Sequence, residues 1–205
     1  KYKVKRVVFT SSSSVYGDND SDIKHEDLVL FPISPYGVTK LMGEHYCRMF
    51  YNSYGLETVC LRLFNVFGPM QNPDSEYSAV IPHFIKSVLS DKSPTIYGDG
   101  TQSRDFTYVE DVTNAFVLAS QAKKIAGMSF NVAYNNTTSV NKLLEIINSL
   151  AGKKINPVYE PARKSDIKNS CAGIELAQKH LKYIPKYNLE KGLKKTVEWF
   201  KDNIS

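Results

Sequence analysis

An apolar segment that ends in a row of serines is the feature that most constrains the fold of this sequence. Residues 4–10 combine β-branched residues with an aromatic, which is typical of a buried β-strand. The strand leads directly into Ser11 to Ser14, which are therefore expected at its carboxyl end. Because ligands of open α/β sheets bind outside the carboxyl ends of the strands, the serine loop is a candidate site.

A helix and a second strand are predicted to follow this loop. Ser34 and Pro35 form a helix start, with a capping serine and a proline in the first turn. Gly55 is expected to end the helix, and residues 58–63 predict a strand that leads into a polar loop. The apolar residues that recur at helical spacing are Val38, Leu41, Met42, Tyr46, Met49 and Phe50. The order strand, serine loop, helix and strand indicates an α/β fold.

The remaining chain predicts further helices with short strands between them. We expect helices at 79–90, at about 110–121, between a capping Ser139 and Gly152, near 174–181 and at about 189–201. Short strands are expected at 95–97 and 129–132, and residues 155–170 are expected to be extended.

Composition places the chain among soluble, cytoplasmic proteins. Its 205 residues suffice for one good core, or for one and a half domains, and 42% of them are hydrophobic. No apolar run is long enough to cross a bilayer, so no membrane partner is expected. The basic residues are dispersed without interleaved aromatics, so no nucleic acid is expected either. The three cysteines are scattered, which predicts reduced thiols and no metal site.

Tyr36 and Lys40 form the candidate chemical centre of the helix. Residues four apart share one helix face, so the lysine is expected beside the tyrosine ring. An ammonium group there favours the phenolate form of the tyrosine. A serine hydroxyl from the preceding loop then bridges the phenol and a substrate oxygen, which is an arrangement that moves one proton off a sugar hydroxyl.

Four segments together point to a family. They are SSSSVYG at 11–17, SPYGVTK at 34–40, RLFNVFGP at 62–69, and GDG at 98–100 followed by RDF at 104–106. With these segments the chain resembles the extended short-chain dehydrogenase/reductases. Among them it is most similar to the NAD-dependent nucleotide-sugar 4-epimerases of the UDP-galactose 4-epimerase type.

The resemblance implies the C-terminal portion of a Rossmann-type parallel sheet with a small α/β substrate-binding domain. Residues 1–67 and 106–135 correspond to the NAD-binding domain, and residues 68–105 and 136–205 mainly to the substrate domain. Members of the family begin with a glycine-rich turn that holds the cofactor pyrophosphate, and no such motif occurs here. We therefore expect the chain to be a truncated piece of a longer enzyme, inactive by itself.

The resemblance also implies a reaction and its residues. The family oxidises C4 of a UDP-sugar with bound NAD, turns the 4-keto sugar over and returns the hydride to its other face. Tyr36 matches the base, Lys40 the group that activates it and contacts the nicotinamide ribose, and Ser12 the bridging serine. Ser11 and Leu63 match positions that border the cofactor.

Substrate contacts are implied by position. Arg104 and Arg163 match two arginines that clamp the diphosphate, a task that suits a guanidinium fork. Asn65 matches an asparagine at the diphosphate, and Asp166 an acid at the ribose. The other positions that match the substrate site are Ser12, Ser13, Val80, Tyr97, Phe106 and Ser170.

Ser170 carries a more specific expectation. It stands seven residues after Arg163, where the family has a residue that limits the sugar pocket. A tyrosine there crowds an N-acetyl group on C2, whereas a serine leaves room. We therefore expect the substrates to be UDP-GlcNAc and UDP-GalNAc, UDP-Glc and UDP-Gal, or both pairs.

The resemblance also implies a homodimer, which family members form through the helix that carries Tyr36.

Other functions on the same fold require different residues. Related dehydratases and decarboxylases carry acidic residues where this chain has Ser13 and Ser14, so those reactions lack their acid and base. UDP-glucuronate 4-epimerases share the serine row, although they tend to have threonine in place of Asn65, and they stay open as an enzyme alternative. A non-catalytic nucleotide-binding protein on the same fold is the alternative from another class.

Overall fold

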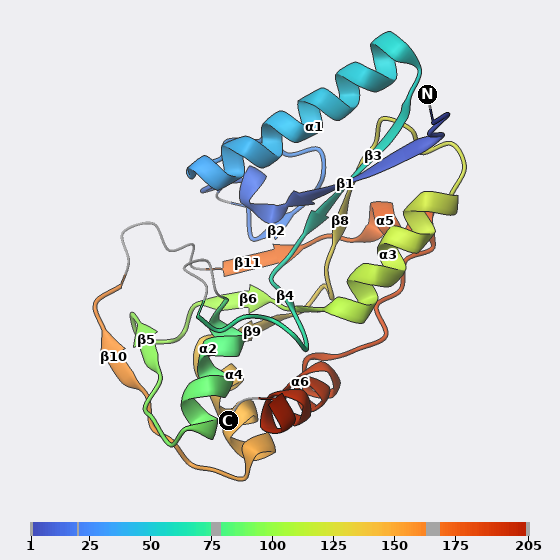
Figure 1. Ribbon diagram of the computed structural model, residues 1–205. Helices are drawn as coiled ribbons and strands as arrows, with labels where there is room; N and C mark the ends of the chain where they lie inside the picture. The colour runs from blue at the N-terminus through green and yellow to red at the C-terminus, as the bar shows by residue number, and fades with distance from the viewer. Residues whose placement is uncertain (1, 20, 75–78, 163–168, 204–205) are drawn as a thin grey trace.

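The structure is a computed structural model that describes residues 2–19, 21–74, 79–162 and 169–203. One part is a three-stranded parallel sheet in the order β1-β3-β8. It is formed by β1 (Arg6–Ser12), β3 (Glu57–Leu63) and β8 (Ser129–Val132). Helix α1 (Pro35–Tyr54) lies along one side of this sheet and α3 (Val109–Gln121) along the other (Figure 1). The parallel α/β arrangement confirms the predicted fold class.

The second part consists of three helices and short strands. The helices are α2 (Val80–Leu89), α4 (Val140–Ala151) and α6 (Leu189–Asn203), which pack against one another. A four-stranded sheet contains, in spatial order, β2 (Ile23–Lys24), β11 (Asn169–Ala172), β6 (Ser103–Asp105) and β9 (Thr137–Ser139). Two parallel pairs complete it, β4 (Val66–Phe67) with β7 (Thr107–Tyr108) and β5 (Thr95–Tyr97) with β10 (Val158–Glu160).

The helix boundaries follow from local chemistry, as the sequence predicts. The Ser34 hydroxyl accepts a hydrogen bond from the Gly37 N–H at 3.1 Å and so caps α1. Gly55 takes the left-handed conformation that ends this helix, with φ of 67°. Ser139 and Gly152 play the same two roles at the ends of α4. The predicted helices α2, α3, α5 (Glu175–Leu181) and α6 are also confirmed.

Helix α1 turns its apolar stripe away from the sheet. The residues that it buries are Gly37, Glu44 and Cys47. Val38, Met42, Tyr46, Met49 and Phe50 are exposed instead. Leu41 is the predicted apolar residue that packs, half-buried, against the core of the sheet. The helical spacing was predicted correctly, but most of the apolar side chains face away from the sheet, so other contacts also hold the helix.

Strand β1 departs from the prediction of a buried strand. Among the described residues it pairs only with β3 and so lies at the edge of this sheet, and Val7 is 38% exposed. The prediction was wrong because a strand rich in β-branched residues signals pairing, while its burial depends on what covers it.

Two hydrophobic clusters match these two parts. One surrounds the parallel sheet and includes Val59, Leu61 and Phe130. The other lies between α2, α4 and α6 and includes Ile85, Ile147 and Phe200. Helix α5 packs into the first cluster although residues 136–205 were assigned mainly to the substrate domain. The domain boundaries themselves stay a prediction.

Candidate active site and substrate cavity

The serine loop forms a short turn at the end of β1. Ser12 caps a 3-10 helix, η1 (Ser13–Val15). Its hydroxyl oxygen accepts hydrogen bonds from the Ser14 N–H at 3.2 Å and from the Ser14 hydroxyl at 2.9 Å. The Ser12 side chain is half-buried, so its own hydroxyl hydrogen can be directed toward a ligand at the carboxyl edge of the sheet.

Helix α1 approaches this turn closely through a glycine. A Cβ built on Gly37 would lie 2.7 Å from the Ser14 carbonyl oxygen and 2.8 Å from the Pro32 side chain. Any other residue at position 37 would force the helix and the turn apart. The glycine that follows Tyr36 therefore sets the spacing between the tyrosine helix and the serines.

Tyr36 and Lys40 lie beside each other at the start of α1, as predicted. The Lys40 ammonium is 5.4 Å from the centroid of the Tyr36 ring. It also donates a hydrogen bond to the Thr10 carbonyl oxygen at 3.0 Å, which fixes the lysine against β1 two residues before Ser12. The Tyr36 side chain is 49% exposed, so its phenol is open to a ligand.

The two predicted cofactor neighbours are placed differently from each other. Leu63 ends β3 directly opposite Ser12 in the strand pairing and is half-buried. Ser11 is only 1% exposed, and its hydroxyl donates to the Glu44 carboxylate at 2.5 Å. Its side chain is thus engaged inside the protein, which leaves a cofactor contact by Ser11 to its main chain.

Five predicted substrate positions line one cavity of about 550 Å³. They are Asn65, Val80, Tyr97, Arg104 and Phe106. They come from the loop after β3, from α2, from β5 and from the segment around β6, which lie far apart in the sequence. The volume is within the range of small-molecule sites. Sequence reasoning therefore brought together residues that the fold also brings together.

Asn65 is held at the edge of this cavity in an unusual conformation. Its φ is 33°, in the left-handed region. Its side-chain amide donates to the Asp105 carbonyl oxygen at 3.0 Å, and its own carbonyl oxygen accepts from the Thr107 N–H at 3.2 Å. These bonds tie the loop after β3 to the β6–β7 segment that carries Arg104.

The other predicted residues that the structure describes do not line the cavity. Ser12, Ser13, Tyr36 and Lys40 lie at the serine loop and α1, outside its lining. Ser170 lies in β11 and pairs with Arg104 in the neighbouring strand β6. The two other predicted residues of this set, Arg163 and Asp166, lie outside the described residues.

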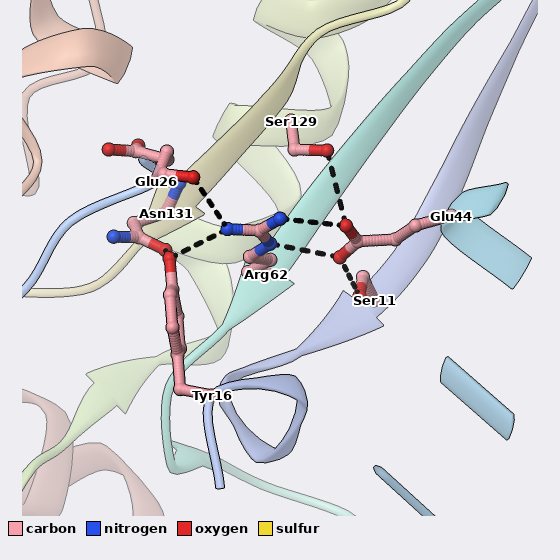
Figure 2. A network of polar contacts seen from close by, with 7 residues as sticks. All are labelled: Ser11, Tyr16, Glu26, Glu44, Arg62, Ser129 and Asn131. Carbon is pink, nitrogen blue, oxygen red and sulfur yellow. Dashed lines mark hydrogen bonds and ion pairs between the residues drawn. The ribbon is translucent and has the colours of Figure 1, made fainter. Parts of the chain in front are cut away.

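A buried ion pair joins α1 to the sheet (Figure 2). Glu44 on α1 accepts from the Arg62 guanidinium on β3 through both of its carboxylate oxygens, at 2.9 and 2.8 Å. The two side chains are 6% and 3% exposed. Ser11 and Ser129 also donate to the Glu44 carboxylate, so α1, β1, β3 and β8 all meet at this one group.

The network continues through Arg62 toward the serine loop. Its guanidinium donates at 2.9 Å to the hydroxyl oxygen of Tyr16, and this hydroxyl donates at 2.7 Å to Asn131. Burial raises the pKa of Tyr16 to about 12, against the lowering effect of Arg62. Burial likewise raises the pKa of Glu26, whose carboxylate accepts from the Asn131 N–H. The phenol of Tyr16 thus stays a neutral structural donor.

Sequence reasoning missed this network, although two signals were present. Glu44 stands four residues after Lys40, on the face that also carries Tyr36. Arg62 is the single charge inside the apolar core of a predicted strand, where it needs a partner. Neither signal identifies the partner, which is supplied by the fold.

Asp105 is a second buried acidic group, with no exposed surface. Its carboxylate accepts hydrogen bonds from the N–H groups of Tyr134 at 3.1 Å, Asn135 at 3.0 Å and Ala172 at 3.3 Å. Burial raises its pKa from 3.8 to about 6, and these three bonds oppose the rise. The residue directly follows Arg104, so it lies behind the cavity wall.

A family model matches the chain. The NAD dependent epimerase/dehydratase family model covers residues 1–133, so the chain belongs to this family. A UDP-glucuronate 4-epimerase from Thermodesulfobacterium geofontis is 38% identical over 99% of this chain and 61% of its own length. The match shows the family and leaves the sugar open.

Solved structures of UDP-sugar 4-epimerases have the same fold as this chain. The UDP-N-acetylglucosamine 4-epimerase of Methanobrevibacter ruminantium M1, in complex with UDP-N-acetylmuramic acid, is 41% identical with a TM-score of 0.93. The match covers 98% of this chain and 64% of that one. The UDP-glucose 4-epimerase of Thermotoga maritima, solved with UDP-glucose, is 36% identical with a TM-score of 0.94, and the match covers 100% of this chain and 66% of that one. The chain thus spans less than two thirds of the length of these relatives.

Two other kinds of site are absent from the part of the chain that the structure describes. No helix there combines the length and the apolarity needed to span a membrane. No group of three or more histidine, cysteine, aspartate or glutamate side chains is placed there to hold a metal ion.

Replacing Glu44 with glutamine should destabilise the protein strongly. The substitution leaves the Arg62 charge buried without a counter-charge, which costs about 3–5 kcal/mol. Urea unfolding measures this loss. The control is Glu57→Gln, which breaks the Arg6–Glu57 pair on the same sheet, where Glu57 is 47% exposed and the expected loss is below about 1 kcal/mol. Equal losses in the two variants would contradict the central role of the buried pair.

The buried Asp105 carboxyl should make stability depend on pH. Its folded pKa of about 6 lies above its ordinary value of 3.8, so folding favours the protonated form. This contribution is fully present below about pH 4 and is lost as pH rises through 6. It is on the order of 2–3 kcal/mol, since each tenfold change in proton affinity corresponds to about 1.4 kcal/mol.

The measurement compares unfolding free energies of the wild type and of Asp105→Asn at pH 4 and pH 7. The wild type should lose stability relative to the variant between these two values. A difference that does not change with pH would show that Asp105 titrates normally.

Proposed function

We propose that this chain supplies the proton-transfer and substrate-binding parts of an NAD-dependent UDP-sugar 4-epimerase. The observation that carries the proposal is the pairing of two sites in one fold. Tyr36 and Lys40 stand against the serine loop, while Asn65 and Arg104 line a cavity of ligand size. Family membership and the names of the relatives support the same reaction. The activity is proposed for the whole protein that carries this chain.

Proton transfer is the task of the serine loop and α1. The C4–H bond of a sugar is not acidic, so inversion at C4 requires oxidation, in which a base removes the 4-hydroxyl proton. Tyr36 is the proposed base because its phenol is open to the site. Lys40 is the proposed activating group because its ammonium lies 5.4 Å from the centroid of the Tyr36 ring. Ser12 is the proposed bridge between the phenol and the sugar oxygen, with Ser13 as the neighbouring alternative.

The residues present fit an NAD cofactor at the same edge of the sheet. Lys40 offers an ammonium group held in place at β1, and Leu63 offers an apolar surface opposite Ser12. NAD, when bound, accepts the hydride from C4 and returns it. The role of the protein here is to hold the sugar hydroxyl at Tyr36 and to keep the proton within reach for its return.

The cavity is the proposed site of the UDP group. A guanidinium suits a diphosphate, since it presents parallel donors to phosphate oxygens, and Arg104 is the described arginine in the lining. Asn65 provides an amide at the same wall. Val80, Tyr97 and Phe106 offer the apolar and aromatic surface that a uracil base and its ribose require. Arg163 and Asp166 stay predicted contacts.

As substrates we propose UDP-GlcNAc and UDP-GalNAc, either alone or in addition to UDP-Glc and UDP-Gal. The supporting observation is the small side chain of Ser170 in the strand next to Arg104. UDP-glucuronate is the second candidate, because a UDP-glucuronate 4-epimerase is 38% identical over nearly the whole chain. We further propose a cytoplasmic homodimer that covers the exposed apolar face of α1, which includes Met42 and Tyr46.

Tyr36→Phe should abolish epimerisation while leaving UDP binding intact. Loss of a positioned base lowers kcat by about 10²–10⁴-fold. The whole protein is incubated with UDP-GalNAc, UDP-Gal and UDP-glucuronate, with and without added NAD, and the C4 epimers are separated by chromatography. Tyr54→Phe, an exposed tyrosine at the other end of α1, is the control and should retain activity.

The outcomes separate the candidates. Epimer from the N-acetylated sugar supports the first substrate proposal, and epimer from UDP-glucuronate alone supports the second. Full activity of Tyr36→Phe would refute the assignment of the base. Absence of any epimer from the wild type, even with NAD, would leave the non-catalytic alternative.

Ser170→Tyr should reduce activity on UDP-GalNAc about tenfold or more and spare UDP-Gal. A bulky ring beside Arg104 removes the space for an N-acetyl group, while the smaller hydroxyl of UDP-Gal still fits. The ratio of kcat/KM for the two sugars is the measurement, and Ser170→Ala, which stays small, is the control. Undiminished N-acetyl activity in Ser170→Tyr would rule out the steric explanation.

A further inference from the structure

Asp105 has no part in the chemistry proposed above, yet three separate segments meet at its carboxylate. The N–H groups of Tyr134 and Asn135 belong to the loop that follows β8, at the carboxyl edge of the parallel sheet. The N–H group of Ala172 belongs to the last residue of β11, in the four-stranded sheet. Asp105 itself ends β6, so one side chain connects the two parts of the fold.

The same residue contacts or adjoins two residues of the cavity lining, and it lies near a third predicted substrate position. Arg104, in the cavity lining, is its direct neighbour in β6. Asn65, also in the lining, donates its side-chain amide to the Asp105 carbonyl oxygen at 3.0 Å. Ser170 pairs with Arg104 across β11 and β6, and the Ala172 N–H two residues later is held by the Asp105 carboxylate.

The cost of this arrangement suggests that it serves more than packing. Burial raises the pKa of Asp105 to about 6, so near neutral pH the charged form is kept inside the protein at the expense of stability. An acid of this kind next to a cavity is a candidate functional group. The carboxylate charge suits the task, because one carboxylate can accept several N–H bonds at once and so hold several chain segments together.

We propose that Asp105 is a positioning residue of the substrate cavity. By holding β6 and β11 against the loop after β8, it sets Arg104, Asn65 and Ser170 in the relative positions that a UDP-sugar requires. Asp105 touches no substrate in this arrangement and acts through the three residues. The inference rests on the proposed function, since it assigns the cavity to UDP.

The test uses UDP as the probe and the whole protein that carries this chain. Asp105→Asn keeps the size of the side chain but replaces one accepting oxygen with an NH₂ group, which faces main-chain N–H groups that need an acceptor. Asp111→Asn is the matched control. Asp111 is also buried and accepts from two N–H groups, those of Lys186 at 2.8 Å and Tyr187 at 3.0 Å, but it is not among the residues that line the cavity.

Isothermal titration should show that Asp105→Asn binds UDP at least tenfold more weakly than the wild type, while its affinity for NAD stays within twofold. Asp111→Asn should bind both ligands as the wild type does. If Asp105 has a purely structural role, the substitution should instead weaken the binding of both UDP and NAD, or of neither. Either of those two results for Asp105→Asn would overturn the inference.

A second variant tests the inference if Asp105→Asn is unstable. If Asp105→Asn does not fold, Asp105→Glu keeps the charge but displaces it by one methylene, and it should fold and bind UDP more weakly than the wild type. Wild-type UDP affinity in that variant would overturn the inference. If the wild type does not bind UDP, the proposed function is refuted, and the inference with it. If the wild type binds UDP and both Asp105 variants bind it equally well, the inference alone is refuted.

Discussion

The buried ion pair between Glu44 and Arg62 is the contact on which the rest of the site depends. Helix α1 buries Gly37, Glu44 and Cys47 and exposes most of its apolar side chains, so only a small apolar contact, which includes Leu41, holds it on the sheet. A charged pair with 6% and 3% exposure is stable only when its other hydrogen bonds are made, and here Ser11 and Ser129 make them. Those partners belong to β1 and β8, so the helix has one favoured position on the sheet. The position of the helix in turn fixes where Tyr36 and Lys40 lie.

Both halves of the proposed site lie beyond the carboxyl ends of parallel strands, which share one edge of a sheet. The serine loop follows β1, the loop of Asn65 follows β3, and the loop held by Asp105 follows β8. Proton transfer is assigned to the first loop and to α1, and binding of the nucleotide to the cavity beyond the second. The proposed reaction thus uses two clusters of side chains, one for the sugar and one for the nucleotide. Each cluster has its own buried acid, Glu44 for the first and Asp105 for the second.

Features that depend on residues close together in the sequence could be predicted, whereas features that depend on distant residues could not. Helix α4 was predictable from local signals, because Ser139 caps it and Gly152 ends it. The two-residue strands β2, β4 and β7 were not, since their form depends on partners far along the chain. The resemblance located five residues of the cavity, because the RLFNVFGP and RDF segments carry specific side-chain patterns. It did not reveal that the Ser11 hydroxyl is occupied by a residue 33 positions away, or that β1 would lie at an edge, because both depend on tertiary contacts.

A crystal structure of the whole protein with NAD and a UDP-hexose would test the division of labour most directly. We expect the diphosphate beside Arg104 and Asn65, and the sugar 4-hydroxyl within hydrogen-bond distance of both the Tyr36 phenol and the Ser12 hydroxyl. Density for the nucleotide outside the cavity, or a sugar whose 4-hydroxyl is directed away from Tyr36, would contradict the assignment of the two sites.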